Sequence, residues 1–156
     1  GTKGYLDNIA VGDDGRFEGT LNAPRRVIQE ADPIPGLSGQ SYFGFQQLAV
    51  SRTGIDAGAA IVTSPFGDVI TLLDSTGQTV IHADGDSSPT TEGTVFIRSD
   101  RTLAINDAGD VGYSVVLDGT TNGASDDRAV TLWNKSTGAY QLVVRESDPF
   151  PSGGGT

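Results

Sequence analysis

The chain of 156 residues is long enough for one domain with a hydrophobic core, and its 22 glycines, without helix-favouring runs, are typical of short strands joined by tight turns. Its 20 acidic and 10 basic residues give a net charge of −10, which repels phosphate backbones, so nucleic acid is not an expected partner. The absence of cysteine excludes disulfides and cysteine-based catalysis, and no apolar run is long enough for membrane insertion.

Two short phrases recur in the same order along the chain. The first has the form Ile/Leu-Ala-Val/Ile-x-x-x-Gly and occupies residues 9–15, 48–54 and 103–109. The second is a pair of β-branched residues followed closely by Asp, and it begins at Val27, Val80 and Val143. Such repetition is the signature of a repeat architecture. The sequence therefore predicts a single all-β domain, residues 1–156, with repeats at approximately 1–47, 48–102 and 103–156.

In the first repeat, β-forming residues separated by turn residues predict strands at 8–11, 16–21 and 26–29. The interval between the two phrases is shorter here than in the other repeats. We therefore expect the first repeat to be one strand short. We assign the missing strand as the counterpart of residues 69–73 and 129–133.

The second repeat predicts strands at 48–51, 59–63, 69–73 and 79–82, with a further strand at 94–98. The third predicts strands at 103–106, 111–117, 129–133 and 140–144, with a polar loop at 118–127. Four antiparallel strands joined by tight turns form the kind of sheet used as a propeller blade. The expected fold is thus all-β, with three antiparallel, blade-like (β-propeller-like) repeats.

Two physical problems follow from this expected fold. A closed propeller needs about four or more blades, so three are too few. An incomplete sheet also leaves the edge of a strand exposed, and exposed edges pair readily with another chain. We therefore expect either closure in another arrangement or pairing with copies of the same chain or with a longer parent.

The third repeat carries more specific motifs: Asn-Asp-Ala-Gly-Asp-Val at 106–111, Ala-Val-Thr-Leu-Trp at 129–133 and Arg-Glu-Ser-Asp-Pro-Phe-Pro at 145–151. In these motifs the chain resembles bacterial secreted tandem-repeat proteins of the choice-of-anchor, Asn-Asp-Ala-Gly-x-Val type. The resemblance implies an extracellular or cell-surface location, propeller-like repeats and no assigned catalytic residues. Ala31 and Ser147 depart from it, because the family pattern favours Gly at both positions.

Acidic residues in two turn segments are candidates for a metal site. Asp84 and Asp86 flank a glycine, and Asp107 and Asp110 surround the turn of the third repeat. Ca²⁺ binds several oxygen ligands, which carboxylates and carbonyls supply. These four residues are the candidate Ca²⁺ ligands, and no other cofactor is expected. The alternative is that they only form turns, which Asp-Gly pairs favour.

Neither the histidine nor the paired carboxylates predict catalysis. His82 is the only histidine, and no companion residues for a zinc site or a catalytic triad can be identified. Glu30 with Asp32, and Glu146 with Asp148, have the residue types of a glycosidase pair. They recur with the repeat, however, so we expect Asp32 and Asp148 to cap the turn before a proline.

Three aromatic residues, Tyr42, Phe43 and Phe45, form a dense cluster in a segment rich in Gly, Ser and Gln. Most other aromatic residues fall in predicted strands, where packing in the core is the default. Large aromatic side chains on a surface often anchor an interface. These three residues are therefore the candidates for contact with a partner.

The sequence favours a non-catalytic, extracellular structural protein that associates with copies of itself, as an oligomer or a filament. A strand of one copy would complete the short first sheet of the next copy. The alternative is a propeller-type module that binds a glycan or a surface protein through loops such as 119–127. A third alternative, a polysaccharide-degrading enzyme, would need a carboxylate pair in a cleft.

Overall fold

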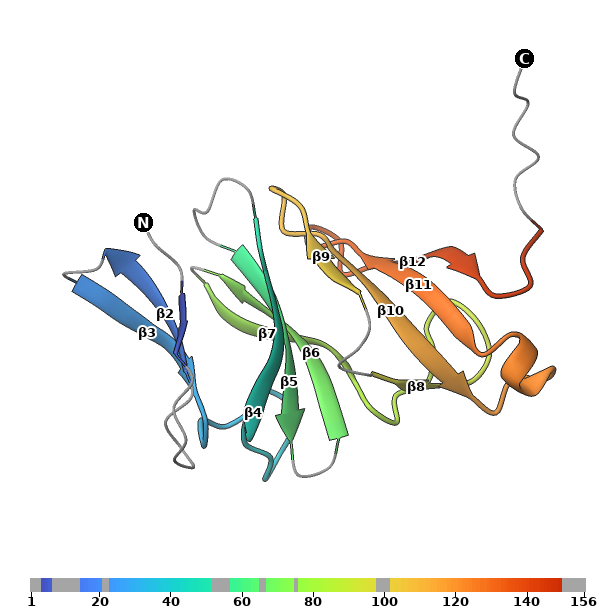
Figure 1. The fold of residues 1–156 in the computed structure, drawn as a ribbon, viewed down its shortest axis with the longest axis horizontal. Coiled ribbons are helices and arrows are strands. Elements are labelled where there is room, and N and C mark those ends of the chain that lie inside the picture. Colours follow the sequence, from blue (N-terminus) through green and yellow to red (C-terminus); the bar gives the residue numbers. More distant parts are fainter. Residues whose placement is uncertain are drawn as a thin grey trace, which may run out of the picture.

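The computed structural model describes residues 4–6, 15–20, 23–51, 57–64, 67–74, 76–97 and 102–149. These residues form twelve strands and a short 3-10 helix, and every strand pairing among them is antiparallel. The all-β, antiparallel expectation is confirmed. The strands form three sheets, which follow one another along the long axis of the molecule in chain order (Figure 1).

The first sheet has the strand order β1-β2-β3. Its strands are β1 (Gly4–Leu6), β2 (Gly15–Thr20) and β3 (Ala23–Gln29). β2 and β3 lie at two of the predicted positions, whereas β1 was not expected. The predicted strand at 8–11 lies outside the described residues.

The second sheet has the order β4-β5-β6-β7 and contains the four predicted strands of the second repeat. They are β4 (Gly44–Val50), β5 (Ala57–Ser64), β6 (Gly67–Asp74) and β7 (Gly77–Ala83). β6 and β7 meet in a tight hairpin, in which the Thr76 N–H donates a 2.7 Å hydrogen bond to Asp74 Oδ1. Asp at the start of such a turn holds the backbone through its own side chain.

The third sheet has the order β12-β11-β10-β8, and β9 pairs with β10 as well. Its strands are β8 (Thr94–Phe96), β9 (Leu103–Ile105), β10 (Val111–Asp118), β11 (Arg128–Trp133) and β12 (Tyr140–Arg145). β8 pairs with the end of β10 and β9 with its beginning, so both lie along the same edge of β10. The loop between β10 and β11 contains the 3-10 helix η1 (Gly123–Ser125).

The last two strands of each sheet form equivalent hairpins: β2–β3, β6–β7 and β11–β12. Each hairpin has one shift of register, which falls between Arg16 and Phe17, between Ile70 and Thr71, and between Val130 and Thr131. An extra residue at the same place gives each hairpin the same local bend. β2 is therefore the counterpart of β6 and β11.

This equivalence corrects the expected position of the missing strand. β2 occupies the position in the sheet where the spacing of the two phrases predicted that a strand is missing. β1 pairs with β2 as β5 pairs with β6. Among the described residues, the first sheet instead has no counterpart of β4. The assignment of the missing strand was wrong because the number of residues between the two phrases does not reveal which strands those residues form.

Each hairpin runs into a four-residue turn, Gln29–Asp32, Ala83–Asp86 or Arg145–Asp148, which we call the Asp turn. In each, the Asp carboxylate accepts a hydrogen bond from the N–H three residues earlier, with N–O distances of 2.9, 2.9 and 2.7 Å. The Asp N–H in turn donates to the carbonyl of that earlier residue. The predicted turn-capping role of Asp32 and Asp148 is confirmed. Asp86 makes the turn in the second repeat, so Ile81, rather than Val80, is the counterpart of Val27 and Val143.

The third residue of each Asp turn has a left-handed backbone. Its φ is +67° at Ala31, +90° at Gly85 and +73° at Ser147. L-residues with a side chain are disfavoured in this region, which glycine enters freely. The backbone thus explains why a repeat pattern would favour Gly where this chain has Ala31 and Ser147.

At the third residue of the Asp turn, a change from Ala to Gly and a change from Gly to Ala should alter the free energy of unfolding in opposite directions. Ala31→Gly should raise the free energy of unfolding by about 1 kcal/mol, because it relieves the left-handed strain. Gly85→Ala should lower it by about the same amount, since a Cβ there would meet no atom within 4 Å and only the φ matters. Chemical denaturation of both variants beside the wild type measures the two changes. A loss of stability in Ala31→Gly would contradict this account.

The second and third sheets pack face to face around the main core. β6 is almost wholly buried, and its Ile70 and Leu72 belong to this core together with Val115 and Trp133 of the third sheet. The opposite face of β6 packs into a smaller core that includes Tyr42, from the segment between β3 and β4. A strand buried on both faces does not alternate between apolar and polar residues, and residues 69–73 are accordingly apolar except for the buried Thr71.

Polar contacts also join the second and third sheets. The Tyr140 hydroxyl donates a 2.6 Å hydrogen bond to the carbonyl of Ile81. Lys135, in the turn between β11 and β12, forms a 2.7 Å ion pair with Asp74 at the end of β6. Burial raises the pKa of Asp74, but the hydrogen bonds from Lys135 and Thr76 outweigh it, so the net pKa lies below the usual range.

Candidate functional site

One face of the third sheet points away from the second sheet, is largely apolar, and is covered by no other sheet among the described residues. Register places Ser114, Val130 and Val144 in one row across β10, β11 and β12. Leu132 lies two residues further along β11, on the same face. The side chains of Ser114, Val130 and Leu132 are partly exposed, and Val144 is 46% exposed. We call these four residues the outer face.

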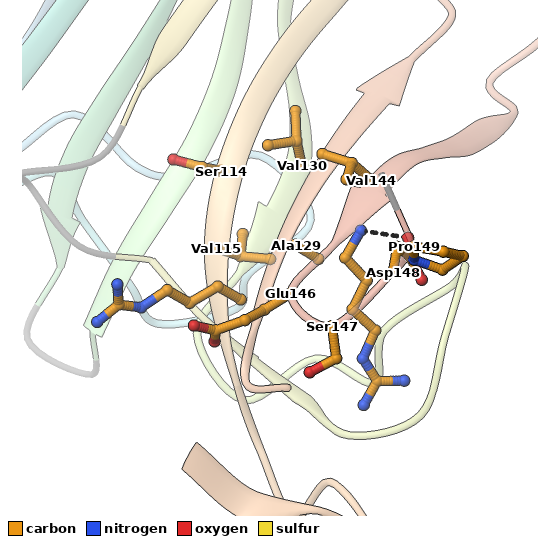
Figure 2. Close-up of a pocket in the computed structure, with 11 residues that line it drawn as sticks. Ser114, Val115, Ala129, Val130, Val144, Glu146, Ser147, Asp148 and Pro149 are labelled. Atoms are coloured by element: carbon orange, nitrogen blue, oxygen red, sulfur yellow. Dashed lines mark hydrogen bonds between the residues drawn. The ribbon is translucent and has the colours of Figure 1, made fainter. Parts of the chain in front are cut away.

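A groove of about 650 Å³ opens beside this row. Its walls are Val130, Val144 and the Asp turn of the third repeat, where Ser147 and Pro149 border it (Figure 2). Arg128 and Glu146 also border the groove, so charged groups lie beside apolar ones. The turn is held by the hydrogen bond between the Arg145 N–H and Asp148, which Figure 2 marks.

The outer face has a covered counterpart in the second sheet. Relative to the register shift, Val130 corresponds to Ile70, Leu132 to Leu72 and Val144 to His82. Ile70 and Leu72 are buried in the core under the third sheet, and His82 is buried against Tyr113 of β10. The same positions that pack against another sheet in the second repeat are therefore not covered by any sheet of the described residues in the third.

Backbone hydrogen bonds of the Asp turns differ between the third repeat and the other two among the described residues. Ala31 N–H donates to the Tyr42 carbonyl and the Tyr42 N–H to the Asp32 carbonyl, at 2.8 and 3.0 Å. The second repeat repeats this pattern between its Asp turn and Val95, at 2.9 and 2.8 Å. In each case the turn holds the segment that leads into the next sheet. In the part of the chain that the structure describes, Ser147 has no such partner.

The candidate Ca²⁺ ligands lie in two separate turns. Asp84 accepts hydrogen bonds from the N–H groups of Asp68 and Ile97, at 2.9 and 2.5 Å, and Asp86 closes its Asp turn. Asp110 accepts from the Asn106 amide and from the Lys135 N–H, while Asp107 is exposed. Among the described residues, no three His, Cys, Asp or Glu side chains gather where they could hold a metal ion. The carboxylates of Asp84, Asp86 and Asp110 thus act in turns and between strands.

The aromatic cluster divides between core and surface. Tyr42 is buried, and its hydroxyl donates a 2.9 Å hydrogen bond to Gln78 Oε1, so it does not reach the surface as an interface residue would. Phe43 is 60% exposed, and Phe96, which follows the equivalent Val95, is 41% exposed. The side chain of Phe45 lies outside the described residues.

The loop 119–127 is held by internal contacts. Arg145 reaches into it through a 3.0 Å ion pair with Asp126 and also pairs with Glu92 at 3.1 Å. Hydrogen bonds from Thr120 and Asn122, together with Arg145, hold the pKa of Asp126 below its usual range. Many polar groups of this loop are therefore already engaged, which leaves fewer of them for a ligand.

His82 lies at the junction of the second and third sheets. Its Nδ1 is 2.8 Å from the Tyr113 hydroxyl, and its ring packs against Tyr140 with 5.4 Å between ring centroids. Burial lowers the pKa of His82 below its usual value of 6.5, although Asp86 acts in the opposite direction. This packing therefore favours the neutral form of the histidine.

Acidification should weaken the fold through His82. Because its folded pKa is lowered, the unfolded chain binds the proton more readily, so its contribution to stability is complete above pH 6.5 and declines below it. We expect the free energy of unfolding to fall between pH 7.5 and 5.5, where carboxylates stay charged. His82→Gln should lose less over the same range. Equal slopes for both proteins would contradict this assignment.

The described residues define a class: an all-β protein with three antiparallel sheets, two of which pack face to face, and with a largely apolar face on the last sheet that none of these residues covers. Residues 10–156 match the family of unknown function DUF7453, and the chain belongs to this family. No curated protein and no solved structure matches the chain. Among the described residues, no helix has the length and apolar character that crossing a membrane requires.

The outer face is not evident from the sequence. Val130 and Val144 fall in predicted strands, and an apolar residue in a strand is by default a core residue. A signal was present, since the alternating apolar residues of 128–133 point to both faces of their sheet. The sequence did not indicate that only one of these faces is covered.

Proposed function

We propose that this protein is a non-catalytic structural repeat protein of the cell exterior that associates with copies of itself. The units are propeller-like, in the sense that the second and third antiparallel sheets pack face to face and the same kind of turn follows each hairpin. The observation that carries the proposal is the match between the outer face and the covered face of the second sheet. An apolar face equivalent to an existing interface supports a further sheet as its partner.

The first sheet supports the same proposal from the other end. Its β1 lies at an edge of the described sheet and spans Gly4–Leu6, with no described counterpart of β4 beside it. Exposed strand edges are sites where another chain adds a strand. A strand from a neighbouring copy at this edge would complete the first sheet.

The extracellular location rests on the resemblance of the third repeat to secreted tandem-repeat proteins and on composition. A chain without Cys and Met avoids the two most readily oxidised side chains. Its net charge of −10 supports solubility and makes copies repel one another at long range. Self-association should therefore strengthen as salt screens the charges.

The test is the mass of the purified chain in solution as a function of concentration, with electron microscopy of the same samples. We expect species larger than the 16.1 kDa monomer at high protein concentration and moderate salt, and filaments or rings in the images. A chain that stays monomeric over the whole range would overturn the proposal. A thermal shift caused by a glycan in that monomer would instead favour a binding module.

A further inference from the structure

We propose that the partner of the outer face is the first sheet of a second copy of this chain, stacked head to tail. This inference rests on the proposed function and names its site and partner. The outer face, Ser114, Val130, Leu132 and Val144, would take the role that Ile70 and Leu72 have within the chain.

The first sheet is the expected partner because its hairpin has the same register shift as the hairpin of the third sheet. The sheet that covers Ile70 and Leu72 contains the β11–β12 hairpin, with its register shift between Val130 and Thr131. The β2–β3 hairpin of the first sheet has its shift at the same place. Within a copy, the first and third sheets lie at opposite ends of the long axis (Figure 1). A first sheet from a second copy therefore continues the succession of sheets with the same geometry.

The direction of stacking follows from the symmetry of the contact. The outer face at one end would meet a different surface at the other end, so the contact is heterologous. A heterologous contact does not stop at a dimer: it grows into an open filament or closes into a ring. The Ser147 N–H beside the groove has no backbone partner among the described residues, and it would hold the incoming copy as the Ala31 and Gly85 N–H groups hold Tyr42 and Val95.

The experiment compares two valine-to-aspartate variants of the full chain. Val144 on the outer face and Val50 at the end of the edge strand β4 are 46% and 43% exposed, so both substitutions should leave the fold intact. Val144→Asp would place a charge in the interface and should weaken association at least tenfold in analytical ultracentrifugation. Val50→Asp should associate like the wild type.

The outcomes separate this inference from the proposed function. If the wild type assembles and Val144→Asp assembles equally well, self-association stands and the outer face is not its site. If Val50→Asp is as defective as Val144→Asp, the inference also fails. Association that stops at a dimer would overturn the head-to-tail arrangement. A wild type that never assembles overturns the proposed function itself, and this inference with it.

A labelling experiment remains informative even if Val144→Asp does not fold. The chain contains no cysteine, so a single introduced thiol has no background. Ser114→Cys lies on the outer face, and Ala108→Cys lies in the exposed turn between β9 and β10. Maleimide should label both at low concentration, and assembly should protect only Ser114→Cys. Equal labelling of both thiols in the assembled protein would overturn the inference.

Discussion

Truncation of Leu72 to alanine should lower the free energy of unfolding by about 3 kcal/mol, whereas truncation of Leu132 should cost about 1 kcal/mol or less. The two leucines occupy equivalent positions in β6 and β11. Leu72 is 2% exposed in the core between the sheets, so its loss leaves a cavity. Leu132 is partly exposed, so water fills the space that its side chain leaves.

The comparison is best made by chemical denaturation of dilute protein, where copies do not associate. The fluorescence of the single tryptophan, Trp133, reports on the same core. If Leu132→Ala were as destabilising as Leu72→Ala in the monomer, the outer face would be covered by the chain itself. The outer face would then not be open, and the proposed function, which depends on it, would lose its support.

Substitution of Gly93 by alanine should destabilise the fold by about 2–4 kcal/mol. Gly93 has φ +98°, and a Cβ there would lie 2.9 Å from the carbonyl oxygen of Asp118. That atom belongs to the backbone and cannot rotate away as a flexible side chain could. The glycine therefore allows the segment before β8 to approach the end of β10 closely.

Gly77 provides the matched control for this prediction. It also has a positive φ, +130°, but a Cβ there would meet no atom within 4 Å. Gly77→Ala should thus show the backbone strain alone, about 1–2 kcal/mol, and Gly93→Ala should be clearly worse. Thermal unfolding of both variants separates the two contributions. Equal losses would mean that the approach at Gly93 is not tight in solution.

The strands of the second and third repeats could be predicted from local patterns. The predicted strand at 111–117 is observed at Val111–Asp118, and that at 129–133 is observed at Arg128–Trp133. Alternating β-branched residues bounded by Gly and Asp suffice for this, because side-chain period and turn chemistry act over a few residues. The role of Asp148 was predictable for the same reason.

The candidate site was less predictable. Tyr42 and Phe43 are neighbours in a single aromatic cluster, yet one is buried and the other is exposed. Successive residues of an extended segment point to opposite sides, so which of them is buried depends on where the other sheet lies. The prediction of which strand the first sheet lacks was wrong for a related reason. Only the pairing register distinguishes β2 from a counterpart of β4.

The sequence by itself determined the all-β class, the positions of most strands and the turns capped by Asp32 and Asp148, since these depend on contacts between residues close in the chain. Only the tertiary structure decided which face of each sheet is covered. Ile70 and Val130 are equivalent in sequence and register, but another sheet packs on the first and none of the described residues covers the second. Burial is a property of distant segments brought together, and local sequence does not encode it.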